Sequence, residues 1–453
     1  MLVFARIFEV PKEGPMRRRG LLVGLVALAM LGSGLQAIAA PITIEWWGEF
    51  TGFEAKGTEN AVARWNATHP NVQVKYTGMP DLDKKVVASV RAGNPPAIVS
   101  VGDNQNYPQF VANGMYTALD SQLKAKKFNM DVYFQPWTNR AMMVGGKTYG
   151  LPCTDWVEVL IYNKEMFREA GLDPEKPPRT IAEVTEAQRK LTKRDAAGNI
   201  TQMGISFRTT FPGWFVPYYS YMFGATPETL YDAKAKKFLK PEALYQAFEW
   251  IQSMAKEYGA KDLQKFEAGF GGWGTEAEPF LSGKMAMSWN GPWIADHISK
   301  FAPNMDWGVA SAPTVDAIVK KGDFGWIGID TFAIPKGAKN QNEALDFMIW
   351  FSGKEGQFYM NTGPEGSGRI PTVKEFGGAE FYKAAVTNPK LKSFIDIMAG
   401  PAVLPIPYGT PAEQAYNTEL SAILEPILNL EIEPRVAVDQ AIARAQAALD
   451  KMR

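Results

Sequence analysis

Aromatic rings gathered around Trp214 are the first feature of this chain that could do chemistry. Residues 208–221 read RTTFPGWFVPYYSY, and Trp214 follows a glycine after a strand predicted at 204–207. Flat aromatic faces stack on the apolar faces of sugar rings, and amphipathic rings are common in ligand clefts. Most of these rings could instead be buried in the core, but the position of Trp214 at a turn indicates that its ring is presented to a ligand. The glycine-rich run 269–274 presents Trp273 in the same way.

Polar side chains at the ends of predicted strands are the second such feature. Glu49 follows a strand predicted at 42–46, and Asp103 and Asn104 follow one predicted at 97–101. Strands alternate with helices here, which predicts a mostly parallel sheet whose ligand crevice lies at the carboxyl ends of the strands. A loop would be polar in any case. We nevertheless predict Glu49, together with Asp103 or Asn104, as ligand contacts.

The first 39 residues have the pattern of an export signal. Three arginines at 17–19 precede an apolar run at 21–31 and an Ala-Ile-Ala cleavage site at 37–39, with Met16 as an alternative start. The apolar run is too short to cross a bilayer, and no cysteine follows the cleavage site. We therefore expect a soluble periplasmic protein without a lipid anchor.

Composition and charge exclude several classes of function. Removing residues 1–39 leaves 43 basic and 46 acidic side chains, a net charge of −3, so neither nucleic acid nor an anionic membrane is expected as a partner. The 453 residues are enough for two domains. Cys153 is the only cysteine, which rules out an intramolecular disulfide and indicates a buried small side chain. With two histidines in the chain, we expect no metal site and no cofactor.

The stretch 146–180 organises the middle of the chain. An apolar run at 157–162 predicts a buried strand, Asn163 is placed to cap a short helix, and Thr180 with Glu183 forms a capping-box pattern. We interpret this strand as the point where the chain leaves a first lobe. A single domain that continues through an ordinary strand–helix unit is the alternative.

This stretch also resembles a known family. The order Y-G-L-P, a polar pair, an apolar run, Y-N-K, E-A-G-L-D-P and P-P-R-T is similar to the extracellular solute-binding family of ABC importers, which contains the maltose-binding protein. Residues 280–293 (FLSGKMAMSWNGPW) and 362–371 (TGPEGSGRIP) resemble two further segments of that family. The resemblance covers essentially all of residues 40–453. It implies an α/β type II periplasmic-binding-protein fold, with two lobes that are each a mostly parallel sheet flanked by helices.

The resemblance also implies a division of the chain. We predict a signal peptide at 1–39, an N-terminal lobe from 40–156 plus 312–364, and a C-terminal lobe from 157–311 plus 365–453. The crossings between lobes act as hinges near 155–159, 308–313 and 363–369, on which the lobes close around a small ligand.

Further ligand contacts follow from these crossings. In the family the turn of the second segment borders the ligand, which carries over to Trp289, Asn290 and Trp293, and Arg369 holds the variable position of the third segment. Asp155 and Trp156 precede the first crossing strand and are placed at the bottom of the cleft. The remaining predicted contacts are Trp326 and Asp330, which flank a strand at 325–335, and Tyr408 in the loop 405–409.

The function implied is a periplasmic receptor that captures a small mono- or oligosaccharide and delivers it to the permease subunits of an ABC importer. We expect a monomer without enzyme activity. One alternative is a glycerol-phosphate-type ligand, since Arg208 and Arg369 could bind an anion and residues 94–99 (NPPAIV) resemble the glycerol-3-phosphate-binding branch. That branch has an arginine near the position of Tyr408, and this chain has none there. A secreted glycosidase is the other alternative, with its two carboxylates drawn from Glu49, Asp103, Asp155, Glu158 and Asp330.

Overall fold

The computed structural model describes residues 40–101, 106–207, 219–361, 369–374, 389–405 and 413–451. The chain divides into a segment of residues 1–41 and a unit of residues 42–453. The predicted signal peptide lies outside the described residues, so the fold described below is that of the second unit.

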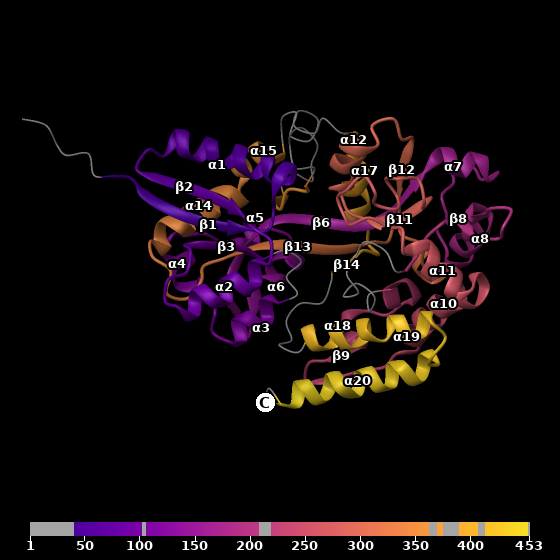
Figure 1. The fold of residues 1–453 in the computed structure, drawn as a ribbon. Coiled ribbons are helices and arrows are strands. Elements are labelled where there is room, and N and C mark those ends of the chain that lie inside the picture. The colour runs from indigo at the N-terminus through magenta and orange to yellow at the C-terminus, as the bar shows by residue number, and fades with distance from the viewer. Residues whose placement is uncertain are drawn as a thin grey trace, which may run out of the picture. The chain divides into compact units, whose positions relative to one another are not determined.

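A mixed β-sheet runs through this unit, and its two long strands β6 and β13 lie side by side (Figure 1). The strand order is β11-β6-β13-β3-β1-β2, with β12 also paired to β6 and β14 to β13. The strands of the sheet are β1 Ile42–Gly48, β2 Val72–Gly78, β3 Ile98–Val101, β6 Gly150–Asn163, β11 Met287–Asn290, β12 Trp307–Ala310, β13 Trp326–Ala333 and β14 Leu404–Pro405. Three two-stranded sheets are formed by β4 Met143–Val144 with β5 Lys147–Thr148, β7 Lys193–Arg194 with β8 Ile200–Gln202, and β9 Tyr231–Asp232 with β10 Lys237–Phe238.

The strand directions differ between the two ends of the sheet. Strands β1, β2 and β3 are parallel, as expected from their alternation with helices. Strands β11, β12 and β13 are all antiparallel to β6, and β13 is antiparallel to β3. The expectation of a mostly parallel sheet in each half therefore holds only around β1. The reason is that β6 carries the chain out of the first half and β13 brings it back, so the two neighbours must run in opposite directions.

The helices lie between and beside these strands. Their bounds are η1 Gly52–Ala55, α1 Lys56–Thr68, α2 Leu82–Arg91, α3 Tyr107–Ala112, α4 Asp120–Ala125, α5 Met130–Tyr133, α6 Pro136–Ala141, α7 Lys164–Glu169, α8 Ile181–Leu191, α9 Pro227–Leu230, α10 Glu242–Tyr258, α11 Ala260–Glu267, α12 Ile294–Phe301, α13 Asp316–Val319, α14 Gln341–Ser352, α15 Lys354–Asn361, α17 Pro389–Met398, α18 Glu413–Ala422, α19 Leu424–Leu428 and α20 Pro434–Lys451.

Local signals in the stretch 146–180 are confirmed. The Asn163 side chain accepts a hydrogen bond from Met166 N and caps α7, and Gly171 follows that helix with a φ of 71°. Thr180 and Glu183 form the capping box of α8. The strand predicted at 157–162 begins seven residues earlier, at Gly150, and is buried along its whole length.

The strand predicted at 204–207 is wrong. The isolated bridge in this region lies just before the segment, between Met203 and Met285, and Gly204 O accepts a hydrogen bond from Met287 N. The next residue, Ile205, is bonded by Gln188 of α8, whose side-chain amide bonds both its N–H and its carbonyl. Polar groups of a buried segment need partners, and here a side chain supplies what a neighbouring strand would have supplied.

Two hydrophobic cores are the largest of the clusters among the described residues. One surrounds Trp46, whose ring contacts Phe332 and Phe351 edge-on. The other contains Trp156, Trp289 and the buried faces of α10 and α20. Separate cores of this kind are what two lobes would need, and the predicted lobe boundaries stay a prediction.

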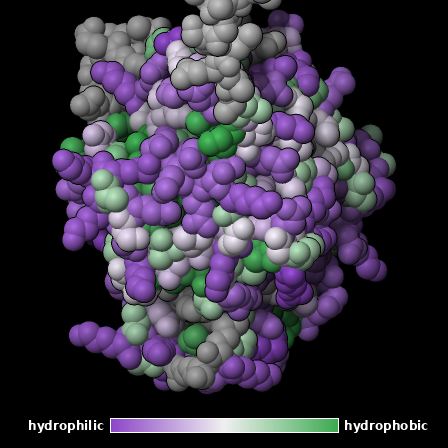
Figure 2. Space-filling view, turned by 90° about the vertical axis from the view of Figure 1, so that its left-hand side faces the viewer, coloured by the Kyte–Doolittle hydropathy of each residue, from purple (hydrophilic) through white to green (hydrophobic). Residues whose placement is uncertain are grey.

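The face shown in Figure 2 is mainly hydrophilic, with hydrophobic residues in small separate groups. Among the described residues, no helix is both long enough and apolar enough to cross a membrane.

Candidate functional site

A buried carboxylate, Asp330 of β13, anchors the site. It accepts a hydrogen bond of 2.7 Å from the Thr154 hydroxyl and one of 3.2 Å from the Trp156 indole N–H. The antiparallel register pairs Asp330 with Thr154 and Gly328 with Trp156. A Cβ at Gly328 would lie 1.9 Å from a ring atom of Trp156, so the glycine leaves the space that the indole fills. The pairing of β6 with β13 therefore fixes the position of Trp156.

Aromatic rings and an arginine extend this anchor. The Trp156 ring meets Trp293 edge-on, with their centroids 5.8 Å apart. The guanidinium carbon of Arg369 lies 4.9 Å from the Trp293 ring centroid and 4.6 Å from that of Phe50, which is cation–π geometry. We call Phe50, Thr154, Trp156, Trp293, Asp330 and Arg369 the Trp156 cluster. It joins four predicted ligand contacts from β6, β13, the N-cap of α12 and the segment that begins at residue 369.

A chain of charged residues leads away from Arg369. Its Nη2 lies 3.6 Å from Glu54 Oε1, and the same oxygen lies 3.4 Å from His297 Nε2. His297 Nδ1 in turn lies 3.9 Å from Glu278 Oε2, which accepts a hydrogen bond from Gly274 N. The chain Glu278–His297–Glu54–Arg369 thus links α12 to η1, which is in the first predicted lobe.

Burial and charge shift the pKa values along this chain. Burial alone would lower the pKa of His297, but its hydrogen bonds to Glu278 and Glu54 outweigh burial and raise that pKa above the usual value. Burial raises the pKa of the neighbouring Asp296 carboxyl to about 6, against the opposing charges of Arg369 and His297. Both shifts favour protonated side chains around Glu54 in mildly acidic solution.

Three other predicted tryptophans lie outside the Trp156 cluster. Trp289 and Trp326 are buried with their ring centroids 6.0 Å apart, and Tyr219 lies 6.5 Å from Trp326. Both rings belong to the larger core, which also contains Trp156 and Trp293, and their role as ligand contacts stays a prediction. Trp273 is different because it is 38% exposed, and its ring meets His297 edge-on at 4.8 Å.

Asn290, Asp155 and Glu49 occupy three further positions. Asn290 is buried at the end of β11 and accepts a hydrogen bond from Gly291 N. Asp155 is buried, and its side chain lies beside Thr138. It points away from the Trp156 side chain, because successive residues of a strand face opposite sides of the sheet. Burial, and next the charge of Asp330, raise the pKa of Asp155. Glu49 directly follows β1. Burial is the largest cause of the raised pKa of Tyr76, and the charge of Glu49 is the next largest.

Four predicted contacts lie outside the described residues: Asp103, Asn104, Trp214 and Tyr408. Sequence reasoning in turn missed Phe50, Glu54, Glu278, Asp296 and His297. The scarcity of histidine was a usable signal, since one of the two in the chain is His297. Glu54 follows the Gly48–Gly52 loop closely enough to have been weighed together with Glu49.

The part of the chain that the structure describes gives no support for a metal site or a reactive thiol. No group of three or more histidine, cysteine or acidic residues there has the arrangement of a metal site. Cys153 is buried as predicted, and burial raises the pKa of its thiol.

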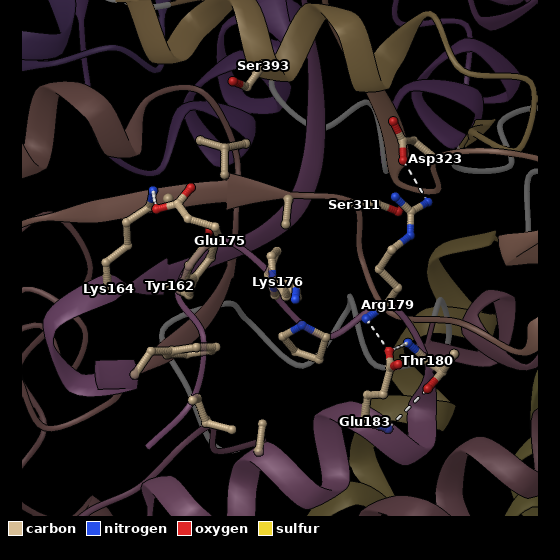
Figure 3. Close-up of a pocket in the computed structure, with 18 of the residues that line it drawn as sticks. Tyr162, Lys164, Glu175, Lys176, Arg179, Thr180, Glu183, Ser311, Asp323 and Ser393 are labelled. Atoms are coloured by element: carbon tan, nitrogen blue, oxygen red, sulfur yellow. Dashed lines mark hydrogen bonds and ion pairs between the residues drawn. The ribbon is translucent and has the colours of Figure 1, made fainter. Parts of the chain in front are cut away.

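A large open groove lies elsewhere, between α7, α8, β12 and α17 (Figure 3). Its volume is about 1160 Å³, and ion pairs cross its walls between Lys164 and Glu175 at 2.7 Å and between Arg179 and Asp323 at 2.8 Å. None of the predicted ligand contacts that the structure describes lines this groove. Its lining mixes both signs of charge with the neighbouring rings of Tyr162 and Phe167, whose centroids are 5.0 Å apart.

The match to a protein-family model decides the classification. Residues 48–358 match the model described as bacterial extracellular solute-binding protein. The chain belongs to this family. Members of this family serve ABC transporters, as the resemblance of the three sequence segments implied.

Solved structures agree with the family and confirm the type II fold. This solute-binding protein is similar to CpMnBP1 with mannotriose bound, with 28% identity, a TM-score of 0.76, and coverage of 89% of this chain and 100% of that one. The maltose/maltodextrin-binding domain MalE of Bdellovibrio bacteriovorus with maltotriose matches at 20% identity and a TM-score of 0.70, covering 90% of this chain and 100% of that one. The second likeness shows the fold alone.

Curated relatives include glycerol-phosphate binders. The sn-glycerol-3-phosphate-binding periplasmic protein UgpB of Rhizobium meliloti is 24% identical over 453 residues, which cover 94% of this chain and 98% of the relative. UgpB of Agrobacterium fabrum is 26% identical over 228 residues, or 48% of this chain and 51% of the relative. The family and its relatives named here are binding proteins.

Proposed function

We propose that this solute-binding protein captures a small uncharged carbohydrate, a mono- or oligosaccharide, between two closing lobes and delivers it to the permease of an ABC importer. The observation that carries this proposal is the Trp156 cluster. Two indole rings, a carboxylate and a guanidinium converge there from segments assigned to both predicted lobes. Carbohydrates need this combination, because their rings have apolar faces and their edges carry hydroxyl groups.

The chemistry of the cluster supports a sugar in three ways. A stacked ring contributes on the order of 1 kcal/mol beyond the burial of its area. Asp330 already accepts hydrogen bonds from Thr154 and Trp156, so its orientation is fixed before a ligand arrives. A carboxylate held in this way accepts hydroxyl hydrogen bonds that are stronger than those between neutral groups.

The structural likeness supports the same class of ligand. CpMnBP1, at 28% identity over 89% of this chain, is described with mannotriose and with mannobiose bound. We therefore place mannose-containing oligosaccharides first among the sugars to be tested. The monomeric state and the periplasmic location are part of the proposal.

A glycerol-phosphate-type ligand is the second candidate. It is favoured by the UgpB relatives and by the buried Arg369, whose side chain could bind a phosphate. The contact between Arg369 and Glu54 weighs against it, because the guanidinium already faces a carboxylate.

A thermal-shift screen of the protein without residues 1–39 tests the proposal. A ligand that binds only the folded protein stabilises it by about 2.7 kcal/mol at a concentration of a hundred times its dissociation constant. We expect a clear rise of the midpoint with mannobiose, mannotriose or another uncharged sugar, and little change with sn-glycerol 3-phosphate. A rise with sn-glycerol 3-phosphate and none with any sugar would refute the proposal. Intact sugar recovered after long incubation would separate binding from hydrolysis.

A further inference from the structure

Arg369 brings a positive charge into the Trp156 cluster, and among the described residues Glu54 is the carboxylate within 4 Å of it. The arginine is 6% exposed and lies between the Phe50 and Trp293 rings. A buried guanidinium without a carboxylate beside it would favour a phosphate, which arginine binds through two parallel hydrogen bonds. The contact with Glu54 therefore bears directly on which ligands the cluster can accept.

Glu54 is itself held from the other side. Its Oε1 lies 3.4 Å from His297 Nε2, and the imidazole is flanked by the edges of Trp273 and Phe53, with ring centroids 4.8 and 5.5 Å away. Glu278 approaches the other ring nitrogen at 3.9 Å. The Glu54 carboxylate thus lies between the guanidinium of Arg369 and the imidazole of His297.

We propose that Glu54 sets the charge of the ligand, because its carboxylate neutralises Arg369 and keeps the site selective for uncharged, hydroxylated molecules over phosphorylated ones. A phosphate placed on Arg369 would bring a second negative group next to Glu54 in a site with little water, where like charges repel strongly. An uncharged sugar meets no such repulsion and still finds N–H donors on the arginine. The inference rests on the proposed function in placing Arg369 beside the ligand.

Other charged groups near Arg369 do not replace Glu54 in this role. Asp296 also acts on Arg369 electrostatically, and burial raises its pKa to about 6. Among the described residues, however, Glu54 contacts the guanidinium within 4 Å and Asp296 does not. Lys300 lies on the same helix as Asp296, with its amine 4.0 Å from the Phe53 ring centroid. Glu54 is therefore the residue whose removal should change the selectivity of the site.

Calorimetric titrations of wild type and Glu54→Gln with mannotriose and with sn-glycerol 3-phosphate at pH 7 test this inference. We expect the affinity of Glu54→Gln for sn-glycerol 3-phosphate to rise at least about tenfold over wild type, as a charge-assisted bidentate contact becomes available. The gain should shrink as salt is added, because the new contact is electrostatic. Glu54→Asp keeps the charge and should show no gain.

Glu59→Gln is the matched control. Glu59 lies on α1 in an exposed ion pair with Lys56, so this variant makes the same chemical change away from the cluster. Circular dichroism at 25 °C checks that each variant is folded, and Glu54→Ala serves as a second charge-removing variant if Glu54→Gln is not folded.

The outcomes separate this inference from the proposed function. A folded charge-removing variant whose affinity for sn-glycerol 3-phosphate is unchanged or lower overturns the role of Glu54, whatever sugar the wild type binds. A gain in that affinity together with a wild type that binds no sugar leaves the role of Glu54 standing and removes the proposed function.

Discussion

Gly328 determines where the Trp156 ring can lie. Its missing side chain leaves room for the indole, and an added Cβ would come within 1.9 Å of that ring. We predict that Gly328→Ala lowers the free energy of unfolding by about 1–3 kcal/mol, the usual cost of overpacking a core. Ligand affinity should fall as well, because the indole must move away from Asp330. Urea denaturation and calorimetry measure the two effects.

Gly272→Ala is the control for this substitution. A Cβ there would meet nothing within 4 Å, so its stability should match wild type. Equal stability of Gly328→Ala and Gly272→Ala would contradict the packing described for Trp156.

The Asp296 carboxyl gives the site a pH dependence. Its pKa is raised from 3.8 to about 6 by burial, so the folded state binds this proton more tightly than the unfolded state does. Protonated Asp296 makes its full contribution to the free energy of unfolding below about pH 4. This contribution, up to about 3 kcal/mol, is lost as the pH rises through about 6. Asp296→Asn should therefore lose less stability than wild type between pH 4 and pH 7, as measured by urea denaturation.

The exposed Asp316 of α13 provides the matched change, Asp316→Asn, which should follow the wild-type pH profile. If Asp296→Asn also follows that profile, the carboxyl does not titrate as its burial implies.

Among the elements, α8 depends on its capping box. Glu183 N donates to Thr180 Oγ1 at 3.1 Å, and Thr180 N donates to Glu183 Oε2 at 3.0 Å. We predict that Thr180→Ala lowers the free energy of unfolding by about 1 kcal/mol, because it leaves an N-terminal N–H of the helix without its acceptor. Thr180→Ser keeps the hydroxyl and should stay close to wild type. Indistinguishable urea midpoints for the Ala and Ser variants would mean that the cap contributes nothing.

Elements with local signals were the ones that the sequence predicted well. The caps of α7 and α8 depend on residues three positions apart, and the apolar residues Val438, Ile442, Ala445 and Leu449 recur at helical spacing and form a buried face of α20. Strand β6 was predicted too short because Pro152 and Asp155 interrupt its apolar pattern. Their backbone groups find distant partners, Ser352 for Pro152 and Ile370 for Asp155. These partners lie far from β6 in the sequence, so a short stretch of sequence around the strand cannot reveal them.

The same limit applies to the candidate site. Family resemblance supplied Trp293 and Arg369, and strand position supplied Trp156 and Asp330. The contact between Trp156 and Asp330 joins residues 174 positions apart, and that between Glu54 and His297 joins residues 243 apart. No local pattern shows that Glu54 and His297 meet, so their contact became visible only in the folded chain.

For the molecule as a whole, we predict that the two lobes close when a ligand binds. The Glu54–His297 contact joins residues 54 and 297, which belong to different predicted lobes, and such a contact must break when the lobes separate. Small-angle scattering should therefore give a smaller radius of gyration with saturating mannotriose, or another bound sugar, than without it. Identical radii in the two states would count against hinged lobes.

Calorimetric titration shows whether the site selects an uncharged carbohydrate. The protein without residues 1–39 is titrated in parallel with mannotriose, maltotriose and sn-glycerol 3-phosphate at equal ionic strength. We expect one site per chain for at least one sugar, with a dissociation constant of about 1 μM or tighter, equivalent to about −8 kcal/mol. sn-Glycerol 3-phosphate should bind at least about a hundredfold more weakly, a difference of about 2.7 kcal/mol. Tight binding of sn-glycerol 3-phosphate with no heat from any sugar would contradict the account.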